Sequence, residues 1–419
     1  MGIQAPVRNT CVLGLFVLAA CAATDTEDPA ADEGSSSAAG SDSSPATGSG
    51  ASDPTTPSTS GGPGGNDGST AGPGGSDDDG SDGSSTGEPG GPPPGLVPAF
   101  IAQGHMGRTM LSCDDGQTWI ADVSLDDTIR CFEGIDCDHD EGSGTGLTAI
   151  DGLLVATWGW GTEGRITTSP DGVEWTEVLT GPTFAGTAYG NDTFIAGARS
   201  PWRAGADATS WQMLPDSGLD EWTPRGTGFV PHEGGIFLIG GGGGGSSDLV
   251  LSSSDGDEWW HPDAFPPTCG DSIRGIAYGD GVIVIARGAN DGAEICVSGD
   301  GGVNFAAVDL ADSPSSPVVW TGEEFVVFAG GTRYASADGQ QWSSSSLGNG
   351  ISVGAMARSP DGTFVGHRDG WMVWYEQQQL YRSADGTDWQ PLGADAFTGG
   401  HPIRHMRFGY VHPHPEGCE

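Results

Sequence analysis

The chain has 419 residues and a formal net charge of −42, from 57 acidic side chains against 15 basic ones, all of them arginine. Proteins bind nucleic acids and anionic lipid headgroups by neutralising phosphates with cations, so this charge excludes both as partners. With 74 glycines and few runs of helix-forming residues, the composition predicts strands joined by tight turns.

The N-terminal segment has the features of an export signal. Arg8 precedes a short apolar run that ends in Leu18-Ala-Ala-Cys21. These four residues resemble the lipobox of bacterial lipoproteins, which implies that residues 1–20 are a signal peptide and that Cys21 carries the lipid. Ala22 resembles the pattern that permits transfer to an outer membrane, so we expect a lipid-anchored protein at the outer membrane or cell surface of a Gram-negative bacterium. An ordinary signal peptide with an incidental Cys21 is the alternative.

The next segment, residues 21–96, predicts a disordered tether. After Cys21 it has no aromatic or basic residue, and Leu96 is its one large apolar residue. Such a chain cannot bury enough surface to offset the entropy of ordering. A flexible coil of this length holds a domain on the order of 50 Å from its anchor.

The remaining chain, residues 97–419, carries an internal repeat. A serine, an aspartate, one or two glycines and a tryptophan recur within seven or eight residues, and the final aromatic returns every 36 to 56 residues, 45 on average. Seven copies end at Trp119, Trp175, Trp211, Trp259, Phe305, Trp342 and Trp389. This period matches one four-stranded blade, so the sequence predicts an all-β, seven-bladed β-propeller.

The repeated residues are those of a structural turn. Serine and aspartate oxygens accept hydrogen bonds from turn N–H groups, glycine adopts positive φ, and tryptophan buries a large surface. The motif resembles the Asp-box, or BNR repeat, of sialidases, sortilin-like receptors, xyloglucanases and a photosystem II assembly factor. This resemblance implies that each box joins the third and fourth strands of a blade, on the face away from the usual binding site.

Both ends of the repeat region contribute to one blade. The segment Ile403–Gly409 matches the first strand of another blade, Ile273–Gly279, whereas the chain after residue 97 begins with a second strand. We therefore expect a C-terminal strand to close the first blade, which leaves no free edge in the ring.

Six cysteines follow Cys21, and an even number in an exported chain predicts disulfides. Of the fifteen connectivities we favour Cys131 with Cys137, Cys269 with Cys296, and Cys113 with Cys418, the last joining the C-terminus to the first blade. A zinc site made from these cysteines and nearby histidines is the alternative.

Tryptophan and arginine gather in the predicted loops that follow the second strands. In an acidic domain, such residues on one face suggest recognition of a carboxylated or sugar-like ligand. The candidate ligand-binding residues are Trp158, Trp160, Arg199, Trp202, Arg203, Arg287, Arg368, Trp371 and Trp374. Alternatively, each arginine only offsets a neighbouring acid and each tryptophan caps a blade.

One segment resembles a calcium loop. Asp136, Asp138 and Asp140 alternate as calcium ligands do, but the glycine stands one place too late and no glutamate follows at the twelfth position. Calcium is the candidate cofactor for this segment, although these two departures count against it.

The resemblance to sialidases raises an enzymatic alternative. Sialidases have six blades and a Phe/Tyr-Arg-Ile-Pro segment before the first box, whereas here Gly164-Arg-Ile-Thr167 lacks the proline and precedes the second box. We therefore expect a non-catalytic, surface-anchored lipoprotein that binds an extracellular glycan or protein, with a carboxylated polysaccharide as the leading ligand and a lipid anchor as its only membrane contact. A sialidase-like glycoside hydrolase or a polysaccharide lyase acting on a carboxylated sugar is the alternative.

Overall fold

The computed structural model describes most of the chain after residue 90. The described residues are 91–124, 142–159, 163–219, 224–243, 246–252, 254–267, 269, 273–288, 294–348, 350–369, 378–393, 396–397, 400–415 and 417–419. Almost all regular structure in them is β-strand, and the short 3-10 turn η2 (His232–Gly234) is the helical exception. Within this part of the chain, no helix is long and apolar enough to cross a membrane.

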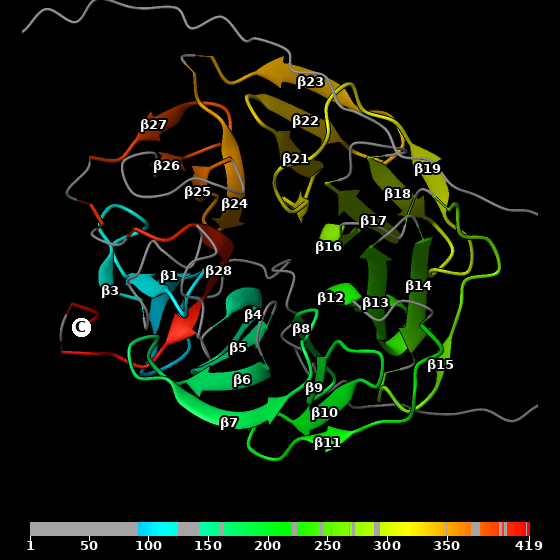
Figure 1. The fold of residues 1–419 in the computed structure, drawn as a ribbon. Coiled ribbons are helices and arrows are strands. Elements are labelled where there is room, and N and C mark those ends of the chain that lie inside the picture. Colours follow the sequence, from blue (N-terminus) through cyan, green and yellow to red (C-terminus); the bar gives the residue numbers. More distant parts are fainter. Residues whose placement is uncertain are drawn as a thin grey trace, which may run out of the picture. The chain divides into compact units, whose positions relative to one another are not determined.

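In the described part of the chain, twenty-eight strands form seven antiparallel four-stranded sheets around a common axis (Figure 1). The inner strands are β28 (Ile403–Val411), β4 (Ser143–Ile150), β8 (Thr187–Gly190), β12 (Pro224–Val230), β16 (Ile273–Gly279), β20 (Val319–Trp320) and β24 (Val353–Arg358). The second strands are β1 (Val97–Gly104), β5 (Leu153–Gly159), β9 (Thr193–Ala196), β13 (Ile236–Gly243), β17 (Val282–Arg287), β21 (Phe325–Ala329) and β25 (Phe364–Arg368).

Each sheet continues outward with two more strands. The third strands are β2 (Thr109–Ser112), β6 (Gly164–Ser169), β10 (Trp202–Gly205), β14 (Ser246–Ser252), β18 (Ile295–Ser298), β22 (Thr332–Ser336) and β26 (Leu380–Ser383). The outer strands are β3 (Ile120–Val123), β7 (Thr176–Gly181), β11 (Gln212–Met213), β15 (Trp259–Trp260), β19 (Ala306–Val308), β23 (Ser343–Ser346) and β27 (Trp389–Pro391). We number the sheets as blades 1 to 7 from the one that contains β1, and the predicted seven-bladed propeller is confirmed.

The core lies between the blades rather than inside one central mass. Seven clusters of buried apolar side chains fill the gaps, one between each pair of neighbouring sheets. Each blade is therefore apolar on both faces, and burial of these faces at roughly 25 cal/mol per Å² of apolar surface drives the ring to close.

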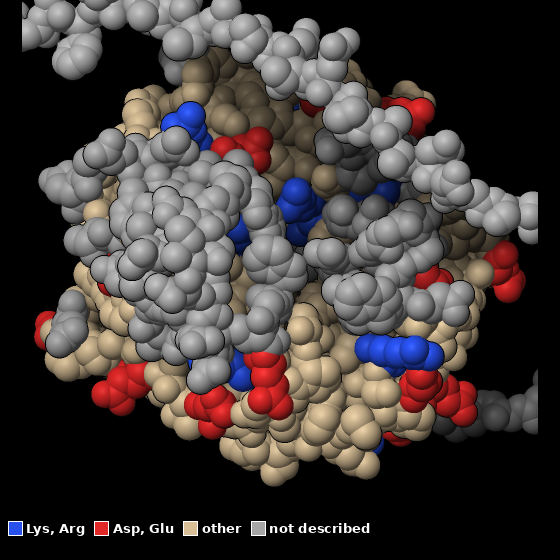
Figure 2. Space-filling view, viewed as in Figure 1, with Lys and Arg blue, Asp and Glu red and all other residues tan. Residues whose placement is uncertain are grey.

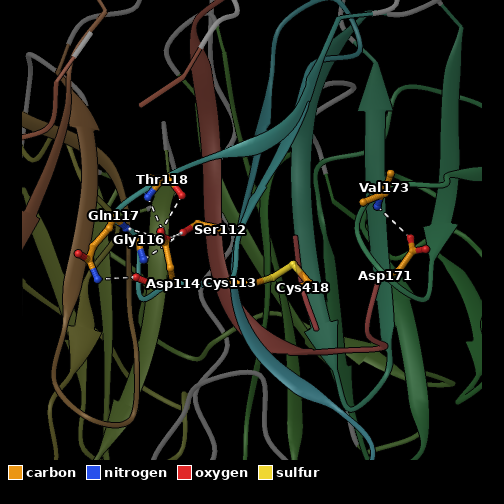
Figure 3. The surroundings of a disulfide bond; sticks show 9 residues. All are labelled: Ser112, Cys113, Asp114, Gly116, Gln117, Thr118, Asp171, Val173 and Cys418. Carbon is orange, nitrogen blue, oxygen red and sulfur yellow. Dashed lines mark hydrogen bonds between the residues drawn. A yellow bond between two sulfur atoms is a disulfide. The ribbon is translucent and has the colours of Figure 1, made fainter. Parts of the chain in front are cut away.

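The split first blade is also confirmed. β28 pairs antiparallel with β1 from Val97↔Val411 to Gly104↔Ile403, so the last strand completes the sheet begun by the first. Cys113, after β2, forms a disulfide with Cys418, after β28, with Cα atoms 5.4 Å apart (Figure 3). The predicted disulfide Cys269–Cys296 is present as well. Cys131 and Cys137 lie outside the described residues.

The boxes form the turns that their residue types predict. In blade 1, Asp114 Oδ1 accepts hydrogen bonds from the backbone N–H groups of Gln117 and Thr118, at 3.1 and 2.9 Å, and Ser112 Oγ accepts one from Gly116 at 3.0 Å (Figure 3). Gly116 has φ +80°, a conformation that favours glycine. Blade 3 achieves the same turn without glycine, because Ala208 adopts φ +49° there.

Candidate functional site

The inner strands of all seven blades enclose a central cavity of about 180 Å³, which we call the channel. Figure 2 shows one face of the propeller, with basic side chains in the hollow at its middle and acidic side chains mostly around its rim. Three arginines from three blades line the channel, namely Arg274, Arg358 and Arg407, together with His405. Among the described residues that line it, none is an aspartate or glutamate.

Backbone bulges carry two arginines near the starts of inner strands, Arg274 in β16 and Arg404 in β28, and Arg274 is the one that lines the channel. In β16 the register with β17 goes from Ile273↔Arg287 directly to Gly275↔Ala286, so Arg274 is the extra residue of a bulge. The pairing of β28 with β1 skips Arg404 in the same way. A bulge re-aims the side chain it carries, and such bulges are common beside functional sites. The same register shift at the start of β12 skips Arg225.

The Arg274 side chain depends on a glycine. A Cβ atom at position 288 would overlap the Arg274 guanidinium, and the backbone of Gly288 needs no positive φ. Gly288 follows β17, so the guanidinium lies at the channel end where second strands finish. We call this end the mouth. The Arg274 guanidinium can occupy this position because residue 288 is glycine and has no side chain.

Arg404 lies at the same end of its inner strand β28. Burial lowers the pKa of Arg404 to about 9, and the positive charge of Arg274 lowers it further in the same direction. Arg274 belongs to blade 5 and Arg404 to blade 1, so the two charges approach from blades that are not neighbours. The charge of Arg274 therefore acts on Arg404 across the channel axis.

Further along β28 from the mouth, Arg407 lines the channel but is otherwise surrounded by protein. Part of its surface is open to the cavity, yet protein surrounds the side chain and burial lowers its pKa. Its Nη1 donates to the Met406 carbonyl at 3.2 Å. Burial, followed by the charges of Arg407 and Arg404, lowers the pKa of His405 to about 3, so this imidazole is neutral at neutral pH.

Other polar groups of the channel wall have hydrogen-bonding capacity to spare. The Nε of Arg358 and the hydroxyls of Thr187 and Thr227 are buried and make no hydrogen bond within the described part of the chain. The Arg358 guanidinium lies over the Phe364 ring, 5.7 Å from its centroid. Buried polar groups usually have a partner, so these atoms indicate a place for water or a ligand.

The structure places two of the expected ligand-binding residues inside blades. Trp158 is 3% exposed, its Nε1 donates to Thr167 Oγ1 at 3.0 Å, and the Arg165 guanidinium covers its ring. Arg287 is 2% exposed. The strands β5 and β17 extend to Gly159 and Arg287, so these positions expected in loops belong to the sheets, and neither side chain is presented on the face.

The other described candidates do not come together. Arg199 is exposed and pairs with Asp216 at 3.0 Å, whereas Arg203 bonds Asp257 and the Asp255 carbonyl in the box turn of blade 4. Boxes follow third strands, so Arg203 lies at the opposite end of the blades from the mouth.

Two further candidates stand apart from each other. Trp202 packs partly buried against the core between blades 2 and 3, and Arg368 is exposed at the end of β25. The three arginines expected to act together, Arg199, Arg203 and Arg368, therefore do not form one cluster.

Several expectations fall on residues outside the described ranges. They concern the tether, the lipid site and part of the predicted face, and the residues are Cys21, Trp160, Trp371, Trp374, Asp136, Asp138 and Asp140. Within the described residues, no group of three or more His, Cys, Asp or Glu side chains is arranged to hold a metal ion.

Neither a protein-family model nor a curated protein matches this chain. Solved structures show distant similarity. A functionally unknown protein from Desulfotomaculum acetoxidans is 13% identical, with a TM-score of 0.49, and the match covers 74% of this chain and 99% of that one. YCF48 bound to a D1 peptide is 14% identical, with a TM-score of 0.45 and coverage of 76% and 95%. Apo AztD from Citrobacter koseri is 10% identical, with a TM-score of 0.45 and coverage of 75% and 98%. Similarity at this level says nothing about what this chain binds.

Proposed function

We propose that the propeller binds a carboxylate-bearing extracellular ligand at the arginine-lined channel and does not turn it over. The observation that carries this proposal is the convergence of Arg274, Arg358 and Arg407 on one cavity in a chain with a net charge of −42. Three guanidinium groups on a cavity whose described lining has no carboxylate favour an anionic occupant. The guanidinium fork suits a carboxylate, which it can hold with two parallel hydrogen bonds.

A carboxylated glycan is the leading ligand and an acidic protein segment the second. The channel lining also includes Thr187 and Thr227, whose buried hydroxyls make no hydrogen bond within the described part of the chain, and sugar hydroxyls can pair with such groups. The lining also contains backbone of Gly146, Gly186 and other glycines, so a polar chain can approach the main chain closely.

Binding is favoured over hydrolysis by the chemistry of the lining. Most glycoside hydrolases need a pair of carboxyl groups on either side of the scissile bond. The described residues that line the channel offer no such pair. We therefore propose binding, and the experiment below also detects sialidase-like hydrolysis or eliminative cleavage of the bound glycan.

We also infer that the chain is a lipoprotein of the Asp-box group, anchored through Cys21 at the outer membrane or cell surface and extended from it by residues 21–96. The support is the lipobox-like Leu18-Ala-Ala-Cys21 and the repeated box turns. Cys21→Ala is expected to abolish palmitate labelling and release the protein from the membrane fraction. Unchanged labelling would refute the anchor.

A glycan array probed with the full chain tests the binding function. We expect retention of uronate-containing glycans, and loss of that signal in an Arg274→Gln/Arg407→Gln variant. Arg203→Gln is the matched control, because Arg203 already pairs with acidic residues away from the channel. Product analysis of the bound glycans completes the test: shortened or unsaturated products would replace the binding function by an enzymatic one.

A further inference from the structure

Arg407 occupies a level of the channel at which the other described lining residues are short. In β28 it stands two residues before Gly409, as Ala277 stands two residues before Gly279 in β16. The lining residues at this position of the other inner strands are Thr148, Ala188, Gly228, Val319 and Ala357. A ligand at this level therefore meets the Arg407 guanidinium and otherwise short side chains.

The Arg407 guanidinium has hydrogen-bond donors to spare. Its Nη1 donates to the Met406 carbonyl at 3.2 Å, and this is the hydrogen bond that the side chain makes within the described residues. A guanidinium carries five N–H donors, and two of them on one side match the two oxygens of a carboxylate. Because protein surrounds most of the side chain, water screens such a pair only weakly.

Blade 4 lies across the channel from Arg407. Arg407 belongs to blade 1, and in the closed ring blade 4 is three places away both from blade 1 and from its neighbour, blade 7 (Figure 1). Thr227 is the second residue after the bulge in β12, and Arg407 is the third after the bulge in β28, so both belong to the same stretch of the channel. A ligand bound to Arg407 therefore faces the wall made by blade 4 and the adjoining blade 3.

Around Thr227 this wall is made of glycine and threonine. The lining residues there are Gly186, Thr187, Gly226, Thr227 and Gly228. The strands β8 and β12 are edge strands of their sheets, so their channel-side N–H and C=O groups have no partner strand. The hydroxyls of Thr187 and Thr227 also make no hydrogen bond within the described residues. Donors and acceptors mixed in this way suit hydroxyl groups, because each hydroxyl can both donate and accept.

We propose that the channel binds one uronic-acid residue of a glycan in a fixed orientation, with its carboxylate on Arg407 and its hydroxyl edge against the glycine and threonine wall of blades 3 and 4. This inference rests on the proposed function and adds the size of the recognised unit and its orientation. In a pyranose uronate the carboxylate and the 2-hydroxyl stand on opposite sides of the ring. The two facing walls of the channel are complementary to these two edges of one sugar.

The size of the cavity fits one such residue. A water molecule needs roughly 10 to 15 Å³ of this kind of space, so the channel of about 180 Å³ holds roughly 12 to 18 waters, or a similar number of non-hydrogen atoms. A hexuronate has about 13 non-hydrogen atoms, so one residue fills most of this space and a second would lie outside it.

Three ligands of one size separate the two edges. Methyl α-galacturonide has the carboxylate and the hydroxyls, methyl α-galactoside lacks the carboxylate, and cyclohexanecarboxylate lacks the hydroxyls. Each is titrated into the full chain by calorimetry. We expect methyl α-galacturonide to bind about ten-fold more tightly than either of the others, because only it pairs with both walls. Trigalacturonate should gain only about three-fold over methyl α-galacturonide, the statistical advantage of three equivalent residues.

Two variants assign the walls. Arg407→Gln should weaken both carboxylates about ten-fold and leave methyl α-galactoside unchanged. Thr187→Val/Thr227→Val should weaken methyl α-galacturonide about ten-fold and leave cyclohexanecarboxylate unchanged. This double variant should melt no lower than the wild type, since it removes hydroxyls that have no hydrogen bond in the described part of the chain. Thr176→Val, at an exposed position of the outer strand β7, is the matched control.

The outcomes separate this inference from the proposed function. Equal binding of methyl α-galacturonide and cyclohexanecarboxylate, or an unchanged ligand preference in Thr187→Val/Thr227→Val, would overturn the proposed orientation. A gain of ten-fold or more with each added galacturonate residue would overturn the single-residue unit, although arginine-dependent binding of trigalacturonate would still support the proposed function. If no carboxylate bound, both would fail. Tighter binding of N-acetylglutamate than of methyl α-galacturonide would overturn the assignment to a sugar.

Discussion

The disulfide between Cys113 and Cys418 should stabilise the ring more than any local crosslink, because it joins residues 305 positions apart. In the chain-entropy description, a crosslink over that separation removes about 5.7 kcal/mol of unfolded-state entropy at 25 °C. Cys269–Cys296 spans 27 positions and removes about 3.6 kcal/mol. We therefore predict that breaking the first costs about 2 kcal/mol more than breaking the second.

Two double variants, each lacking one of the two disulfides, allow the other disulfide to be broken by reduction without removing its sulfur atoms. In Cys269→Ala/Cys296→Ala a reductant breaks Cys113–Cys418, and in Cys113→Ala/Cys418→Ala it breaks Cys269–Cys296. The loss of unfolding free energy on reduction is measured for each variant by urea titration. Since both keep the other cysteines, their contributions cancel when the two losses are compared.

The reasoning predicts the larger loss in the variant that retains Cys113–Cys418. Equal losses, or a larger loss for Cys269–Cys296, would show that the C-terminal crosslink does not restrain the unfolded chain as its span implies.

Three further predictions follow from described contacts. Arg108 is fully buried, and its Nε and Nη2 donate to the two carboxylate oxygens of Asp122 at 2.7 and 2.8 Å. Arg108→Met should therefore lower the unfolding free energy by about 3 to 5 kcal/mol, because it leaves the Asp122 charge buried without this partner. Arg108→Met/Asp122→Asn should recover part of the loss, and a double variant as unstable as Arg108→Met would contradict this. Hydrogen bonds from the N–H groups of Gln341 and Gln340 lower the pKa of Asp338, so its contribution to stability is complete above the unfolded pKa of about 4 and lost as the pH falls through the folded value. Asp338→Asn should therefore cost stability near neutral pH and lose that deficit in acid, and a deficit that persists in acid would count against it. Because the net charge of −42 repels anions at long range and salt screens beyond about 10 Å, the association rate of a carboxylated ligand should rise with added salt in stopped-flow measurements. A rate that falls instead would mean that the arginines dominate the distant field.

The blades could be predicted from the sequence because their determinants are local. A box turn is specified by a serine, an aspartate and a glycine within five residues, as Ser383, Asp385 and Gly386 show, and it forms wherever those residues recur. The shared first blade and the Cys113–Cys418 disulfide followed from the same repeat. The last strand of the chain has the sequence pattern of a first strand, and the blade that begins after residue 97 lacks one. The fold therefore needed no long-range information beyond the count of repeats.

The channel could not be predicted in the same way. Whether Arg274 lines the cavity depends on a bulge in β16 and on the absence of a side chain at Gly288, which is fourteen residues away. Arg358 and Arg407 look like ordinary strand residues until the ring closes around them. The sequence did show arginines within the predicted first strands, as in Ile273-Arg274 and Ile403-Arg404. However, the alternation of apolar and polar residues along a strand does not show which side chains face the central axis of the propeller.

Strand length explains the remaining differences. We expected loops to begin at Trp158 and Arg287, but their strands continue through these positions, so the side chains pack inside blades. Arg203 was assigned to a loop and lies in β10, from which it reaches the box of the next blade. Boundaries of short strands are set by pairing with neighbours, and a single sequence shows that pairing poorly.

The most direct test of the account is a calorimetric titration of the full chain with trigalacturonate and with its neutral analogue galactotriose. We predict that only the carboxylated sugar binds, and that Arg274→Gln/Arg407→Gln lowers its affinity by about ten-fold or more. Equal binding of galactotriose, or an unchanged affinity in a folded double variant, would contradict the assignment of the channel as a carboxylate site.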